Sequence, residues 1–199
     1  MTPSLTAKAS YRAAFTTGSV TVINAATATA GHMFAARWRN TNLAWLVRSI
    51  EAEFILTTAF GAAQEVGIDI VRASITSSHT GGTTLNGPTV PVGAKKYETN
   101  GNASAWDVGG DLRIATTADL TAGSTPAPVL DTRPVARSSF YAGAVGAGFY
   151  QKFDFSRGSI PGLIFQIDQG LIIRNSILMG ATGVGRWTFT FDCEEVQLG

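Results

Sequence analysis

The sequence Trp187-Thr188-Phe189-Thr190-Phe191-Asp192-Cys193-Glu194 decides the fold class. Large apolar side chains occupy every second position, and polar side chains occupy the positions between them. This alternation has the period of a β-strand, whose successive side chains point to opposite faces of a sheet. The segment is therefore predicted to be a strand with one buried face and one solvated face.

The segment before it predicts two more strands. Residues 163–167 (LIFQI) and 171–174 (LIIR) are apolar runs, and Asp168-Gln169-Gly170 separates them. Glycine adopts the positive φ that tight turns require at no steric cost. We therefore expect these two runs to form a β-hairpin, with Gly170 in the turn.

Further strands are expected on the N-terminal side. Period-two or β-rich runs occupy residues 34–38, 43–60, 66–70, 112–114 and 153–155. Only residues 43–60 are ambiguous, because Trp45, Ile50 and Phe54 also fit a helical spacing; their β-rich end favours a strand. About eight short strands with long loops predict an all-β protein, a β-sandwich of jelly-roll type. An immunoglobulin-type Greek key is the alternative fold.

The chain divides into two predicted parts. Residues 1–30 are rich in Ala, Thr and Ser, and their one clear apolar segment lies at residues 20–23. This composition predicts an N-terminal arm or a loosely attached strand, with residues 31–199 forming the sandwich domain. Val20, Val22 and Ile23 are expected to contact a neighbour, by adding a strand to the edge of its sheet.

Charge and composition exclude several function classes. The net charge is +1, and the longest basic run is Lys95-Lys96, so nucleic-acid binding is not expected. No apolar run has the length of a membrane helix, and Cys193 is the only cysteine, which excludes an internal disulfide. Charged residues make up 15%, where about 25% is usual. Either of two explanations accounts for this deficit: the surface is made of uncharged polar residues, or it is buried against a partner or against copies of the chain. If copies of the chain associate, a homotrimer is expected.

No catalytic, cofactor or metal motif is found. Residues 180–187 (GATGVGRW) have the glycine spacing of a phosphate-binding loop, but Arg186 and Trp187 replace its lysine and hydroxyl residue. His32 and His79 lie near no nucleophile motif and are expected at the surface. The acidic pairs at i, i+2 spacing, such as Glu51 and Glu53, are expected on solvated strand faces. These observations predict a protein that is not an enzyme and has no cofactor; a hydrolase on a sandwich scaffold is the minor alternative.

Several stretches resemble small structural proteins of tailed bacteriophages. The resembling pieces are residues 68–73 with 81–83, residues 111–123, and residues 169–175 continuing through 179–183 to a final aromatic strand. The resemblance implies a virion protein without enzymatic activity. The first role it implies is that of a capsid decoration (cement) protein, which binds the major capsid protein or other virion proteins. It would be made in the host cytoplasm and lie on the capsid surface, and it would stabilise the shell.

A tail, collar or head-fibre role is the alternative within the virion, with binding of a receptor or a carbohydrate. Aromatic residues in predicted loops suit such binding, because sandwiches present loops to their ligands. Tyr97, Trp106 and Tyr141 are the predicted interface residues of this kind, and Phe149 and Tyr150 lie in the same class of loop.

Overall fold

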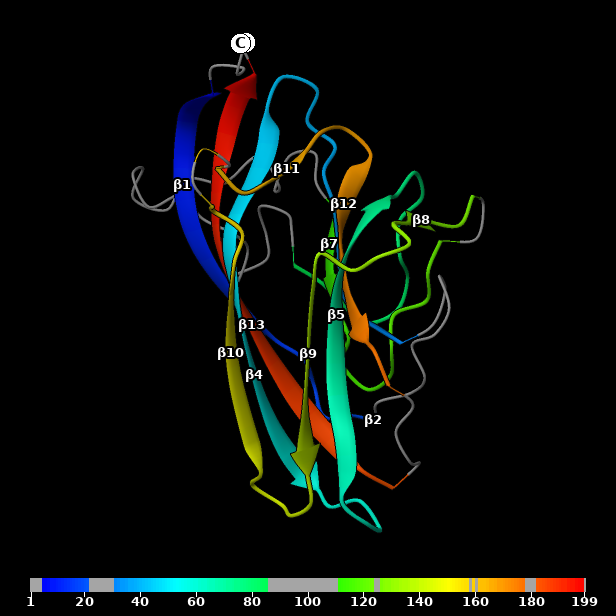
Figure 1. Cartoon of the computed structure of the whole chain (residues 1–199). Helices are drawn as coiled ribbons and strands as arrows, with labels where there is room; N and C mark the ends of the chain where they lie inside the picture. Colours follow the sequence, from blue (N-terminus) through cyan, green and yellow to red (C-terminus); the bar gives the residue numbers. More distant parts are fainter. Residues whose placement is uncertain are drawn as a thin grey trace.

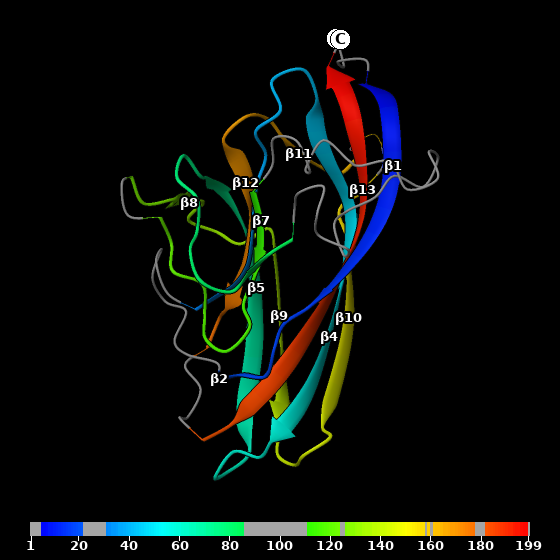
Figure 2. The same cartoon turned by 180° about the vertical axis from the view of Figure 1, so that it is seen from behind.

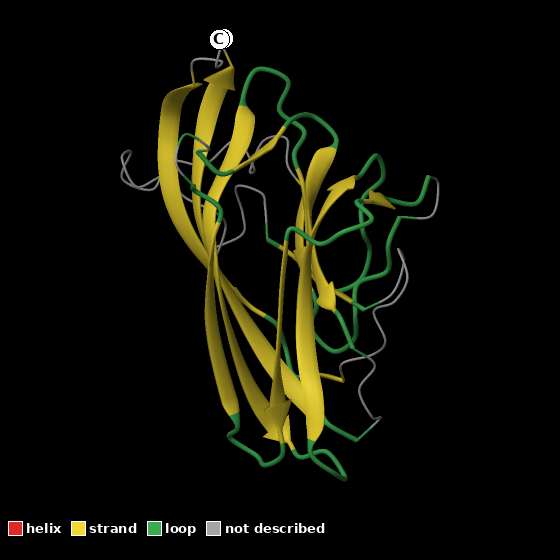
Figure 3. Cartoon of the chain, viewed as in Figure 1, coloured by secondary structure: helices red, strands yellow, loops and turns green. Residues whose placement is uncertain are grey.

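A computed structural model describes residues 5–21, 31–85, 111–123, 126–157, 159, 161–177 and 182–198. These residues form an elongated sandwich of two sheets (Figure 1). They contain strands and loops and no helix (Figure 3), so no helix among them is long and apolar enough to cross a membrane. The predicted all-β sandwich is confirmed.

Within the described residues, eight strands of six residues or more build the two sheets, and five shorter strands extend them. The long strands are β1 (Leu5–Thr16), β3 (His32–Arg37), β4 (Ala44–Thr58), β5 (Gln64–Ser74), β9 (Ala136–Ala142), β10 (Gly148–Asp154), β12 (Gln169–Asn175) and β13 (Val184–Leu198). The short strands are β2 (Val20–Thr21), β6 (Thr83–Thr84), β7 (Asp111–Ile114), β8 (Val129–Leu130) and β11 (Leu163–Phe165).

The long strands pair in a nested order. The first sheet runs β1-β13-β4-β10, and the second contains β3-β12-β5 with β9 paired to β5. The first long strand therefore pairs with the last, the second with the seventh, the third with the sixth and the fourth with the fifth, all antiparallel. This order is compatible with the predicted jelly roll, because a jelly roll is a double sheet of two Greek keys.

Strands β4 and β13 form the centre of the first sheet. They pair over almost their whole length, and a bulge shifts the register where Asp192 lies opposite Ser49 and Cys193 opposite Val47. A bulge adds one residue to one strand, so Val47 and Ile50 both point into the core although their spacing is odd. The strand predicted over residues 43–60 is confirmed, and the helical alternative is wrong.

Aromatic rings join the two sheets. Phe34 of β3 contacts rings from the opposite sheet, with centroid distances of 4.7 Å to Phe191 and 5.9 Å to Phe15. Phe140 of β9 does the same near the other end of the sandwich, at 5.2 Å from Phe54. Each such ring pair contributes about 0.5–1.5 kcal/mol beyond the burial of its surface. The predicted inner face of β13 is confirmed, since Trp187, Phe189, Phe191 and Cys193 are all buried.

The hairpin predicted over residues 163–174 is wrong. Its two runs are strands, but β11 pairs with β4 in the first sheet and β12 pairs with β3 and β5 in the second. The connection therefore crosses between the sheets, and Asp168, with φ of 58°, takes the left-handed conformation that was expected of Gly170. Glycine is needed at position 170 for another reason: a Cβ there would collide with the carbonyl oxygen of Ala36.

The arm predicted over residues 1–30 is wrong for the part that the structure describes. Strand β1 pairs with β13 from Leu5 opposite Leu198 to Thr16 opposite Thr188, and Tyr11 and Phe15 are buried in the core. The inward positions of this strand include small residues such as Ala13, which made the alternation faint. The sandwich therefore begins at β1 and not at residue 31.

Candidate functional site

One end of the sandwich carries no charged residue over two long segments. Residues 54–64 end β4 and turn into β5, and residues 140–151 end β9, turn and begin β10. Neither segment contains Lys, Arg, Asp or Glu. Both turns lie at the end of the molecule opposite the C-terminus (Figures 1 and 2). We call residues 54–64 and 140–151 the uncharged end.

Large apolar side chains are exposed on the uncharged end. The exposed fractions are 77% for Tyr141, 64% for Val145, 56% for Tyr150 and 44% for Ile55. Tyr150 lies opposite Glu53 and Ile55 opposite Gly148, so Tyr150 and Ile55 are diagonal neighbours on the outer face of the first sheet. Adjacent exposed apolar side chains mark interaction surfaces far more often than single ones do.

The support beneath the uncharged end is rigid. The rings of Phe140 and Phe149 stack with centroids 4.4 Å apart and planes 4° from parallel. Trp187, which is fully buried, touches both rings, and an added Cβ at Gly185 would collide with the ring of Phe54. The glycines of residues 180–187 thus include one that makes room for an aromatic ring. A partner therefore meets a preformed surface, which keeps the entropic cost of binding low.

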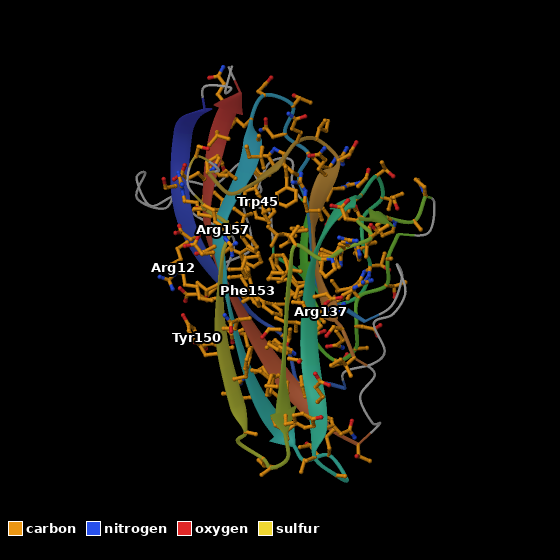
Figure 4. The ribbon with its side chains drawn as sticks, viewed as in Figure 1. Arg12, Trp45, Arg137, Tyr150, Phe153 and Arg157 are labelled. Atoms are coloured by element: carbon orange, nitrogen blue, oxygen red, sulfur yellow. The ribbon has the colours of Figure 1, made fainter. Side chains whose placement is uncertain are left out.

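A hollow of about 490 Å³ lies between the edges of the two sheets, where β9 and β10 separate. It is lined by Val135, Ala136, Arg137, Ser138, Gln151, Lys152, Phe153, Asp154, Phe155, Arg157, Gly162 and Leu163. In Figure 4, Phe153 is drawn between Arg157 and Arg137. Strand β10 pairs with β4 as far as Ser49, and β11 pairs with β4 from Val47, so the chain between Asp154 and Leu163 leaves the edge of β4 and borders the hollow.

Two of the three cations at the hollow have carboxylate partners. Nε and Nη2 of Arg137 donate to the two oxygens of the buried Asp69 carboxylate, at 2.6 and 2.9 Å, and these bonds raise the pKa of Arg137. The Lys152 ammonium lies 3.6 Å from Glu51, which also accepts from Arg12 at 2.7 Å. Within the described parts of the chain, no carboxylate forms an ion pair with the third cation, Arg157.

Replacing Arg137 by Ala is expected to lower the free energy of unfolding by about 1–2 kcal/mol. The substitution leaves the Asp69 carboxylate, which is 2% exposed, with Arg174 at 3.5 Å as its one remaining ion-pair partner among the described residues. Urea denaturation measures the change. The matched control is Arg12→Ala, which breaks an exposed ion pair and is expected to cost about 0.5 kcal/mol or less. Equal losses in the two variants would contradict a structural role of the buried Asp69 carboxylate.

The two histidines form a buried pair, so their predicted surface position is wrong. His32 begins β3 and is 0% exposed, and His79 is 2% exposed. Nδ1 of His32 lies 3.0 Å from Nε2 of His79, which is a hydrogen bond whose donor depends on the tautomers. The polar segment around His79 is covered because it packs against β3, where Arg37 donates to the backbone oxygen of Thr76 at 2.7 Å.

Burial keeps both rings neutral. It lowers the pKa of His32 to about 3, and charges on His79 and Arg174 act in the same direction. Burial also lowers the pKa of His79 to about 4; Asp111 opposes this shift, while Arg113 and Arg37 add to it. A neutral, mutually bonded pair inside the fold stabilises the packing of the segment around His79 and is not placed to take protons from a substrate.

The single cysteine faces the core. Cys193 is fully buried, and burial raises the pKa of its thiol well above the usual value. A thiol in such surroundings is inert as a nucleophile. No group of three or more His, Cys, Asp or Glu side chains within the described residues is arranged to hold a metal ion.

The structure places the predicted interface residues in different surroundings. Tyr141 is exposed but lies in β9, not in a loop, and Phe149 and Tyr150 lie in β10. Val20 lies in β2, which pairs with β13 of its own sheet and not with a neighbour. Val22, Ile23, Tyr97 and Trp106 lie outside the described residues.

Sequence reasoning missed both the uncharged end and the hollow. The signal for the first was present in the two runs without charge. The hollow had no signal, since it depends on where two strand edges separate. In comparisons with known proteins, no family model matches this chain, and no curated protein matches its sequence.

Proposed function

We propose that this protein is a non-enzymatic structural component of a tailed-bacteriophage virion, a capsid decoration protein that binds the major capsid protein and stabilises the shell. The uncharged end is the observation that carries the proposal. A surface that a partner covers has no need of charge to stay soluble, and interface cores are depleted in charged residues and enriched in Tyr.

The remaining features support a structural role. Histidine and cysteine are residue types often used as catalytic bases and nucleophiles. Here His32, His79 and Cys193 are all buried inside the fold. The two-layer sandwich with its inter-sheet aromatic rings is a rigid body suited to repeated placement on a shell. Copies are proposed to associate as homotrimers, which would cover more of the low-charge surface.

Replacing Val145 by Asp is expected to reduce incorporation of the protein into virions at least about tenfold. The new carboxylate lies in an exposed turn, where it does not disturb the fold, but it would be buried without a partner in the docked state. The measurement is quantitative mass spectrometry of purified virions assembled with a tagged copy of the chain.

The matched control is Thr41→Asp, an exposed position in the connection between β3 and β4, which should incorporate like the unchanged chain. This connection lies at the end of the sandwich opposite the uncharged end (Figure 1). Tyr141→Asp should fail as Val145→Asp does. Full incorporation of both variants of the uncharged end, with their unfolding transitions unchanged, would show that this end is not the docking surface.

A further inference from the structure

The hollow is bordered by the edge strands β9 and β10 and by the connection from β10 to β11. Residues 135–138 and 151–154 line its two sides, and Phe155, Arg157 and Gly162 of the connection line it together with Leu163. Its volume of about 490 Å³ lies within the range of small-ligand sites and suits a compact ligand better than an extended peptide.

Its floor combines an apolar surface with neutral polar groups. Phe153, Phe155 and Leu163 pack against the core and are only half-buried, so parts of them face the hollow. Ser138 and Gln151 alternate with the outward residues of their strands and share the inward face with Phe153. Aromatic faces next to hydroxyl and amide groups suit a ring that has apolar C–H faces and hydroxyl edges.

The rim is positively charged. Arg137 pairs with Asp69 and Lys152 pairs with Glu51. Arg157 is exposed, and no described carboxylate pairs with it. Asp154, the one acidic residue at the hollow, accepts a hydrogen bond from the backbone nitrogen of Ser156 at 2.8 Å. A guanidinium can bind a carboxylate through two parallel hydrogen bonds, and no carboxylate of the described residues takes up Arg157 in this way.

The geometry points to a binding site for an acidic saccharide unit, with the sugar ring on Phe153 and its carboxylate on Arg157. An acidic segment of a protein is the other anionic occupant, but a volume of about 490 Å³ favours one compact unit over an extended segment. This inference does not rest on the proposed function, because the uncharged end shares only Gln151 with the lining of the hollow and the two surfaces are tested by different experiments.

The test compares glucuronate with glucose, which differ only at C6, where one has a carboxylate and the other a neutral hydroxymethyl group. Chemical shifts of backbone amides are followed by NMR as each sugar is added to the full chain. Glucuronate is expected to shift amides of β9 and β10 around the hollow, with a Kd of about 1–10 mM, as single sugar units bind weakly. Glucose is expected to bind at least about tenfold more weakly.

Arg157→Ala is expected to weaken glucuronate binding about tenfold and to leave glucose unchanged, while Arg157→Lys recovers part of the loss. Arg186→Ala removes an exposed arginine that does not line the hollow and should change neither. Equal binding of both sugars, no saturable shifts with glucuronate, or shifts that survive Arg157→Ala would overturn the inference. So would binding of a glutamate-rich peptide without binding of glucuronate.

Discussion

Deleting residues 1–17 is expected to abolish the cooperative unfolding transition of this protein. Strand β1 covers the outer edge of β13, and Tyr11 and Phe15 contribute buried rings to the core. Thr17 closes the pairing, since its backbone nitrogen donates to the oxygen of Trp187 and its hydroxyl accepts from the nitrogen of Trp187. Without β1, a long strand edge and part of the core are open to water, and such edges aggregate.

A point substitution tests the same claim in a chain that still folds. Phe15→Ala removes a ring that is 4% exposed and contacts Phe34 and Phe191, so the free energy of unfolding should fall by about 3–4 kcal/mol. Circular dichroism during thermal and urea unfolding measures both variants. If the chain without residues 1–17 unfolds cooperatively at the midpoint of the full chain, β1 is an accessory arm and its place in the sandwich is wrong.

Lowering the pH from 7.5 to 5 is expected to cost about 4 kcal/mol of stability, about 2 kcal/mol from each histidine. Each ring titrates near 6.5 in the unfolded chain and near 3 or 4 in the fold. Below pH 6.5 the unfolded state therefore binds more protons than the folded state. The stabilisation is fully present above pH 6.5 and is lost as the pH falls toward the folded pKa values.

The free energy of unfolding from urea denaturation at pH 7.5, 6.5 and 5 measures this slope. The range above pH 5 limits the contribution of carboxylates, which titrate lower. His79→Gln removes one titrating ring and is expected to halve the slope, even if the variant is less stable at pH 7.5. A slope between pH 6.5 and 5 that stays unchanged in His79→Gln would contradict the neutral buried pair.

Large side chains in strict alternation made much of the fold predictable. The rings of β13 and the apolar runs of β4, β5 and β12 identified their strands, because large apolar side chains at period two are typical of a strand with a buried face. Strands β1 and β9 were missed because small or polar residues, such as Ala13, Ala136 and Ser138, share their inward positions.

The sheet to which each strand belongs could not be predicted from the local sequence pattern. The runs on either side of Asp168 look like a hairpin, and only the packing of the whole chain sends β11 to one sheet and β12 to the other. The histidine pair has the same origin, because His32 and His79 are 47 residues apart and meet through the fold. Functional surfaces depend on such long-range contacts, so the candidate site was less predictable than the strands.

Cryo-electron microscopy of virions purified from the cells that produce this chain tests its proposed role most directly. We expect density for the two-sheet sandwich in many symmetric copies on the outside of the shell, with the uncharged end turned toward the major capsid protein. Virions that contain neither this density nor the chain by mass spectrometry, with the protein remaining free in the lysate, would contradict a structural role in the virion.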